Sequence, residues 1–332
     1  KAGKHPDVAE NTKALSLVYD RKQGGPALTR RIIVIFLSIL FLTGCMPNGQ
    51  RPYVNLRDLE APPPETAKRT GEAPLRIVVS PSLSNRDTVG YYRQLADHVA
   101  VQTGHPTELI YRRSNSEAQA LLASSGADIG FFSTGTYLSY TGSVDLEILV
   151  VPERAQGPVY QALVIVPSDS PAEEIADLAG KSFAFNDSLS FSGAIFPRYL
   201  LKQLNKTPEN FFRQTIFTQS HSKSMQAVAM HMLDGASIDS IAFDHARKNS
   251  PEIANAIRII HLSPSAGTGP IVIRQDIDAA KKDLLRTVFL NMHHNQDMRK
   301  VLRELMFERF TTPQSHLYDY PRHIFTEVKT SP

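Results

Sequence analysis

The stretch Leu75-Arg76-Ile77-Val78-Val79-Ser80 decides the fold class, because from this point the chain alternates short β-branched runs with helical stretches. The segment from Val89 to Val101 directly behind it has its apolar residues at helical spacing. A strand followed by a helix and another strand is the repeating unit of α/β proteins. The pattern predicts further strands at residues 108–111, 128–132 and 146–151, with a helix over residues 117–124.

A second series of apolar runs indicates a second lobe. Its runs are residues 160–166, 182–185, 238–243 and 257–260. A folded part of about 260 residues is large for a single core, so two lobes fit better than one. Two lobes need two crossings of the chain, which we expect near Val166 and near Leu262. We predict lobe 1 from residues 74–163 with 264–332, and lobe 2 from residues 164–263.

The segment before the first strand differs in composition from the folded part. Residues 45–73 are rich in proline and charge and have hardly any apolar periodicity, which predicts a tether. Residues 1–27 are polar and contain no Met, and we interpret them as an extension that is not native to the protein. Residues 1–44 as a whole are therefore interpreted as a signal segment with this extension.

A lipidation signal precedes the tether. Leu42-Thr43-Gly44-Cys45 follows the basic pair Arg30-Arg31 and an apolar run at residues 32–41, and it supplies the only cysteine. The run is too short for a permanent membrane span. The pattern resembles the bacterial lipobox, in which Cys45 becomes acylated; a plain signal peptide with a chance cysteine is the alternative. Lipidation would anchor the protein to a membrane.

Charge and cysteine content exclude several classes of function. The chain has 36 Lys and Arg against 33 Asp and Glu, and without residues 1–44 the count is 29 against 30. No clustered basic face of the kind that binds nucleic acid is evident. A single cysteine excludes a disulfide framework and a site of several thiolates. His293-His294 hints at metal, but adjacent residues on a helix point in different directions, so we predict no metal site and no cofactor.

The segment from Phe185 to Pro197 carries the clearest chemistry. It follows a strand and leads into a helical stretch at residues 194–204. The first N–H groups of a helix lack intrahelical partners and favour negative charge. Ser190, Ser192 and the backbone amides from Phe191 to Gly193 could therefore hold a tetrahedral oxyanion, with Gly193 allowing close approach. Ordinary helix N-capping by serine is the alternative.

Four motifs together resemble the phosphate-, phosphite- and phosphonate-binding proteins of bacterial ABC importers. These motifs are the loop from Asp187 to Gly193 with Pro197 beyond it, the strand Asp128-Ile129-Gly130-Phe131-Phe132, Tyr160 at the entry to the second lobe, and Ser220-His221 opening a helix. The resemblance spans residues 75–290. It implies a type II periplasmic binding protein fold, with two α/β lobes that each have a mixed sheet flanked by helices, and a cleft between them.

The resemblance also implies roles for individual residues. Ser190 and Ser192 would donate hydroxyls to the anion, while His221 and Tyr160 would close on it from the facing surface. Without the resemblance, His221 is a capping or surface residue and Tyr160 a core or junction aromatic. Asn115, at a helix start, is either a cap or a ligand contact.

Four positions depart from the family pattern. Ser188 replaces the usual Pro, which would leave the loop less rigid. Phe191 stands where the family usually has Thr, so its backbone N–H remains but a hydroxyl is lost. Ala246 and Gly269 occupy the expected places of acidic residues that hold an amine, which disfavours an aminophosphonate. Asp244 is the nearest remaining carboxylate; it faces the cleft or caps a helix.

These observations predict a monomeric, lipid-anchored substrate-binding protein on the periplasmic side of a bacterial membrane. It would capture phosphate, phosphite or a phosphonate and deliver it to ABC permease subunits by hinge closure. Met46 after Cys45 favours the outer membrane if the cell has one. A ligand-responsive partner of a membrane sensor is the alternative. An enzyme on the same scaffold is disfavoured, since no Gly-x-Ser-x-Gly or His-Glu-x-x-His motif occurs.

Overall fold

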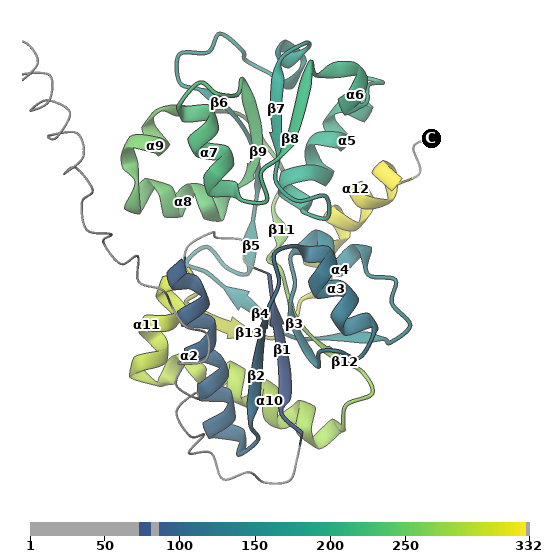
Figure 1. Ribbon diagram of the computed structural model, residues 1–332, viewed down its shortest axis with the longest axis vertical. Coiled ribbons are helices and arrows are strands. Elements are labelled where there is room, and N and C mark those ends of the chain that lie inside the picture. Colours follow the sequence, from purple (N-terminus) through teal and green to yellow (C-terminus); the bar gives the residue numbers. More distant parts are fainter. Residues whose placement is uncertain (1–72, 81–85, 330–332) are drawn as a thin grey trace, which may run out of the picture. The chain divides into compact units, whose positions relative to one another are not determined.

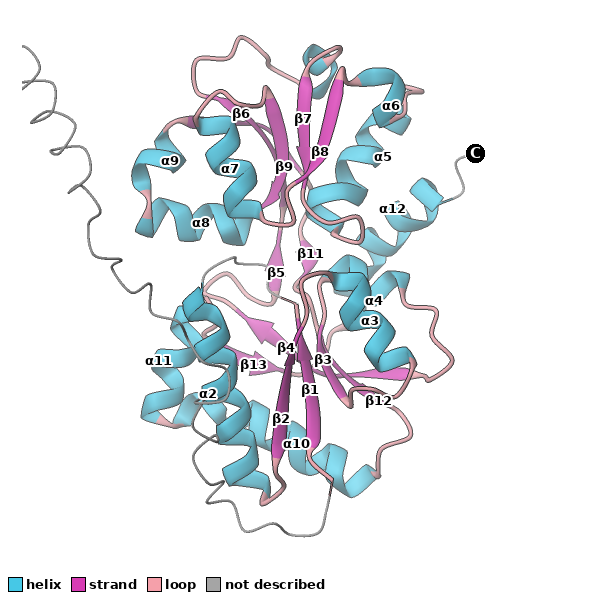
Figure 2. Cartoon of the chain, viewed as in Figure 1, coloured by secondary structure: helices cyan, strands magenta, loops and turns pink. Residues whose placement is uncertain are grey.

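The computed structural model describes residues 73–80 and 86–329, all within one compact unit (Figure 1). The predictions for residues 1–72, among them lipidation of Cys45, lie outside the described residues. Two sheets flanked by helices make up this unit (Figure 2). Within the described ranges, no helix combines the length and the apolar character that crossing a membrane requires.

The first sheet has six strands in the order β13-β4-β12-β3-β1-β2. β1 is parallel to β2 and β3, whereas β12 and β13 run antiparallel to their neighbours, so the sheet is mixed. The strands are β1 Leu75–Val79, β2 Thr107–Tyr111, β3 Ile129–Phe131, β4 Leu146–Glu153, β12 Ile271–Arg274 and β13 Arg309–Thr311.

Helices cover both faces of the first sheet because β1 is apolar on both of its faces. Ile77 and Val79 pack into one buried cluster and Val78, between them, packs into another. The first cluster contains residues of α2 Arg86–Thr103, α10 Ala279–Asn291, η3 Met292–His294 and α11 Gln296–Glu304. The second is covered by α3 Asn115–Ala123 and α4 Thr134–Ser139.

The second sheet has the order β10-β6-β9-β7-β8 and is also mixed. Its strands are β6 Ala162–Pro167, β7 Ser182–Phe185, β8 Gln214–Phe217, β9 Gly235–Asp239 and β10 Ile257–Leu262. One face carries η1 Ile175–Leu178, η2 Phe191–Ile195, α5 Phe196–Gln203 and α6 Pro208–Phe211. The other carries α7 His221–Ala229, α8 Ser240–Asn249 and α9 Pro251–Asn255 (Figure 1).

A two-stranded ribbon joins the two sheets. β5 Val159–Tyr160 pairs antiparallel with β11 Ala266–Gly267, and each strand lies where the chain passes between the sheets. The first crossing therefore precedes β6 instead of lying near Val166, because the run at residues 160–166 consists of two strands. The second crossing follows Leu262, near the expected place. The exact lobe boundaries stay a prediction.

Two segments differ from the pattern that the sequence predicts. The run at residues 238–243 is not one strand, because the carboxylate of Asp239 accepts from the N–H of Ala242 at 2.6 Å and starts helix α8 there. The C-terminal part, expected in lobe 1, ends in α12 Asp319–Lys329, which packs on the second sheet's helices. η4 Ser315–Tyr318 leads into it.

Helix α12 should contribute to stability through Ile324, which is completely buried in the cluster of the second sheet. We expect Ile324→Ala to lower the free energy of unfolding by about 2–5 kcal/mol, because it leaves a cavity that the surroundings fill only in part. Urea unfolding followed by circular dichroism measures this loss. Arg322→Ala, at an exposed position of the same helix, is the control and should change stability by less than about 0.5 kcal/mol. Equal effects would show that α12 does not pack as described.

Candidate functional site

A cavity of about 100 Å³ lies between segments of the two sheets. Several water molecules or one small oxyanion fit a space of this size. Its polar lining from the first-sheet side comprises Ser80, Thr88, Tyr92, Arg113, Asn115, Ser133, Thr134, Arg154 and Thr268. Its polar lining from the second-sheet side comprises Tyr160, Asn186, Asp187, Ser190, Ser192, Gln219, His221 and Asp239.

The loop after β7 provides one wall of the cavity. Ser190 caps the π-helical turn η2, since its Oγ accepts from the N–H of Gly193 at 3.0 Å. Helix α5 continues this turn, so the N–H groups of Phe191 and Ser192 stand at a helix start, where no intrahelical acceptor exists. The structure thus brings the predicted hydroxyls and amides to one place, although Ser190 also serves as the cap.

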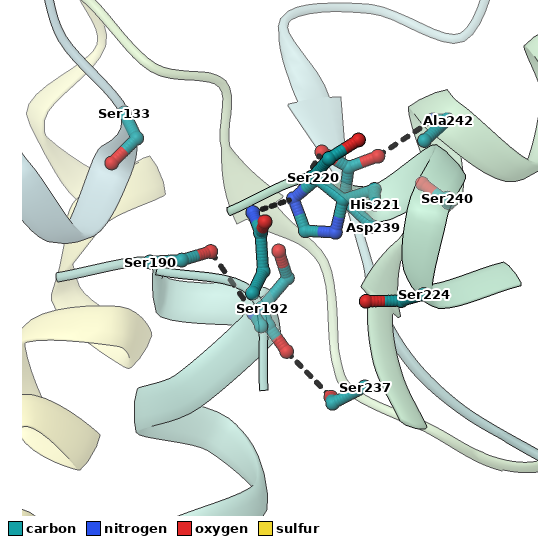
Figure 3. Close-up of polar contacts among 12 residues, drawn as sticks. Ser133, Ser190, Ser192, Ser220, His221, Ser224, Ser237, Asp239, Ser240 and Ala242 are labelled. Atoms are coloured by element: carbon teal, nitrogen blue, oxygen red, sulfur yellow. Dashed lines mark hydrogen bonds and ion pairs between the residues drawn. The ribbon is translucent and has the colours of Figure 1, made fainter. Parts of the chain in front are cut away.

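Ser192 is fixed in position by its burial and by a hydrogen bond to its carbonyl. It is buried, and its carbonyl accepts from the hydroxyl of Ser237 at 2.6 Å (Figure 3). Tyr160 and Thr134 line the same cavity, and the hydroxyl of Thr134 donates to the carbonyl of Gly267 at 2.7 Å. Burial raises the pKa of Tyr160, so its hydroxyl stays protonated and remains a donor. Hydroxyl residues from a first-sheet helix, the ribbon and the loop therefore line one cavity.

Neither the side chain of Phe191 nor a side chain placed at Gly193 would point into the cavity. The ring of Phe191 is buried against Tyr160 and Phe196, so only its backbone can face a ligand. A Cβ at Gly193 would overlap with the Cβ of Asn186. The missing side chain of Gly193 therefore makes room for Asn186, which differs from the expected role of admitting a ligand.

His221 opens helix α7 behind its cap, Ser220, and is buried. Its Nε2 lies 2.8 Å from Nδ2 of Asn186. The carboxylate of Asp239 lies on the same side, with Oδ2 3.3 Å from Nε2 (Figure 3). Nδ1 of His221 and Oδ1 of Asn186 are buried and have no hydrogen-bond partner among the described residues. A buried polar group without a partner is rare in proteins, so these atoms are candidates for contact with a bound molecule or water.

Asn115 connects the first-sheet wall to the loop. Its N–H donates to Oδ2 of Asp187 at 3.3 Å, and its Oδ1 accepts from the hydroxyl of Ser80 at 2.7 Å. Ser114, and not Asn115, caps helix α3. The side chain of Asn115 is thus free of the capping role and lines the cavity.

Asp244 does not line the cavity. Its side chain is 45% exposed and lies 3.7 Å from Arg247 on the same helix, α8. The carboxylate at the cavity, and the cap of this helix, is Asp239. Sequence reasoning missed it because the run at residues 238–243 has the apolar pattern of one strand. Ala246 is buried in the core, whereas Gly269 lines the cavity.

Sequence reasoning also missed Ser133, Thr134 and Arg154. Ser133 and Thr134 follow strand β3 and open helix α4, the same strand-to-helix arrangement as the loop after β7, so this signal was present. Arg154 stands in a turn behind β4, and no local pattern distinguishes it from a surface arginine. No group of three or more His, Cys, Asp or Glu suited to a metal ion occurs among the residues with a described structure.

Comparison with known proteins gives a consistent result. A family model described as "ABC transporter, phosphonate, periplasmic substrate-binding protein" matches residues 77–318. The "Phosphonates-binding periplasmic protein" of Escherichia coli (strain K12) is 26% identical over 188 residues, which are 55% of this chain and 55% of that protein. The match thus spans about half the length of this curated relative.

Two solved structures have the same fold. A binding protein component of an ABC phosphonate transporter from Pseudomonas aeruginosa has a TM-score of 0.71 at 21% identity, covering 78% of this chain and 87% of that one. A protein from Prochlorococcus marinus (MIT 9301) in complex with methylphosphonate has a TM-score of 0.67 at 17% identity, covering 77% and 98%. The predicted two-lobe type II periplasmic binding protein fold is confirmed.

The close contact of Gly193 with Asn186 predicts a structural effect of a single methyl group. Gly193→Ala should lower the free energy of unfolding by about 1–3 kcal/mol, because the loop must move away from Asn186. Urea unfolding measures the loss. Gly90→Ala is the matched control: a Cβ at this position would meet no atom within 4 Å, and in the helix interior the change should stabilise by up to about 1 kcal/mol. An unchanged stability of Gly193→Ala would contradict the packing described.

Proposed function

The chain belongs to the family of periplasmic substrate-binding proteins of phosphonate ABC transporters, and we propose that it captures a small phosphorus oxyanion for import. The candidates are phosphate, phosphite and a phosphonate. The observation that carries this proposal is that the hydroxyl residues Tyr160, Ser190 and Ser192 line one small cavity beside a helix start. Hydroxyl and backbone N–H donors at a helix N-terminus stabilise an oxyanion.

We assign the following roles within this proposal. Ser190, Ser192 and the backbone N–H groups of Phe191 and Ser192 hold the oxyanion from the loop after β7. Tyr160, as a neutral hydroxyl, donates from the ribbon. Asn115 and His221 line the cavity from opposite sheets and complete the set of hydrogen-bond donors to the ligand. Gly193 supports the loop through its contact with Asn186.

Ligand capture in this proposal includes closure of two lobes. We keep the predicted lobes of residues 74–163 with 264–332 and residues 164–263, except that helix α12 packs on the second lobe, and the ribbon of β5 and β11 lies at the crossings. Hinge motion at a few connecting residues is a common way to enclose a ligand. The hydrogen bond from Asn115 to Asp187 joins segments of the two sides and would stabilise the closed form.

We further propose that the protein is a monomer that delivers its cargo to ABC permease subunits without a chemical step. The match to a family of substrate-binding transport proteins supports this proposal. Lipidation of Cys45 would hold the protein at the periplasmic side of a membrane, and Met46 favours the outer membrane if the cell has one. The proline-rich residues 45–73 would separate the folded body from the membrane.

The binding proposal predicts a loss of affinity on removal of one hydroxyl. Titration calorimetry of the purified chain against phosphate, phosphite, methylphosphonate and sulfate should show saturable binding of at least one phosphorus oxyanion. Ser192→Ala should weaken this binding about 10- to 100-fold, since a hydrogen bond to a charged ligand is lost. Ser222→Ala, beside His221 but outside the cavity lining, should leave affinity unchanged. Absence of binding across the panel would refute the proposal.

The anchoring proposal predicts a change of cell fraction. In a bacterial host, the chain should sediment with membranes, and Cys45→Ser should release it into the soluble periplasmic fraction, because the acyl chains provide the membrane affinity. Labelling with a radioactive fatty acid should mark the chain but not the variant. Retention of Cys45→Ser in the membrane fraction would argue against lipidation at this position.

A further inference from the structure

Arg154 is a cation at the cavity that the proposed oxyanion contacts do not use. It directly follows β4, and its N–H and carbonyl both pair with Gly157, at 3.0 and 2.9 Å. Gly157 has a φ of +98°, which a glycine adopts without strain. This tight turn fixes the backbone of Arg154, and its side chain lines the cavity.

The guanidinium of Arg154 packs on an aromatic ring and makes no close ion pair with a described residue. Its central carbon lies 5.4 Å from the centre of the Phe307 ring, a cation–π contact. Its Nε is buried and has no hydrogen-bond partner, and no ion pair of Arg154 occurs among the described residues. Burial lowers the pKa of Arg154 to about 10, so the group stays charged at neutral pH. Asp239 and Asp244 attract this charge without forming a close ion pair, so an anion that contacts the partly buried guanidinium directly would complete this site.

The carboxylates at the cavity already have partners. Asp187 accepts from the N–H groups of Asn115 and Leu189, at 3.3 and 2.8 Å. Asp239 accepts from the N–H of Ala242 and lies 3.3 Å from Nε2 of His221. Within the described part of the chain, neither carboxylate hydrogen-bonds to Arg154, whose buried Nε remains available to a ligand.

The surroundings of Arg154 suit a short carbon chain. Leu305 and Phe307, which follow helix α11, line the cavity, as does Ile241 of helix α8. Planar guanidinium groups bind carboxylates through two parallel hydrogen bonds, a geometry that a lysine does not offer. A volume of about 100 Å³ leaves room for few atoms besides an oxyanion.

We propose that the cargo is a phosphonate with a second anionic group, a short phosphonocarboxylate whose carboxylate binds Arg154 while its phosphonate binds the loop at Ser190 and Ser192. This inference rests on the proposed function and specifies its substrate class. Arg154 then determines specificity within the family of phosphorus oxyanions and does not contribute to binding of the phosphonate group itself.

The test compares ligands that differ only in the substituent. The purified full chain is titrated by calorimetry with methylphosphonate, phosphonoacetate and 2-aminoethylphosphonate. Phosphonoacetate should bind about 10- to 100-fold more tightly than methylphosphonate, the effect of a charge-assisted contact. Arg154→Gln should abolish this preference and leave methylphosphonate affinity within about 3-fold. Arg154→Lys should keep part of it, because the charge remains without the planar fork.

The outcomes separate this inference from the proposed function. Equal affinities for phosphonoacetate and methylphosphonate, tightest binding of 2-aminoethylphosphonate, or an equal loss for both ligands in Arg154→Gln would overturn the phosphonocarboxylate assignment while phosphonate binding stands. No binding of any phosphonate by the folded chain would overturn both. Thermal unfolding checks that Arg154→Gln folds; if it does not, the ligand preference of the unmodified chain and of Arg154→Lys decides.

Discussion

The pairing of β5 with β11 is the constraint on which the arrangement of this protein depends. Two strands of two residues each, Val159–Tyr160 and Ala266–Gly267, join sheets that otherwise have separate cores. Because both crossings pass through this ribbon, Tyr160 stands between the loop after β7 and the helix that begins at Thr134. A short paired connection of this kind keeps the two walls of the cavity next to each other. Any hinge motion would then be confined to the few residues of this connection.

The wall that carries the hydroxyls depends on aromatic packing beneath it. The ring of Phe191 lies against Tyr160, Phe196 and Tyr320, so the side chain that interrupts the run of hydroxyls fixes the loop from below. Phe191 thus offers no side-chain donor but provides a buried anchor. The remaining donors of this loop are the hydroxyls of Ser190 and Ser192 and the amides at the helix start. Their positions are fixed before a ligand binds, so binding does not have to order them.

Part of the site follows from local sequence. A serine before a helix is placed by its own capping bond, so the position of Ser190 relative to Gly193 could be expected from the sequence. The position of Asp239 could not, because the apolar run 238–243 hides a boundary between strand and helix. Apolar periodicity does not separate a buried strand from the first turn of a helix, and only the capping bond to Ala242 does so.

The sequence by itself determined the α/β class, the two series of strands and the loop with its serines, because periodicity, turns and caps act over a few neighbouring residues. Only the tertiary structure decided which charges meet at the cavity. Arg154 and Asp239 belong to different sheets, and their burial depends on long-range strand pairing and on rings such as Phe307. An arginine in a turn has the same local pattern whether it faces solvent or a ligand, so its charge becomes informative only when its surroundings are known.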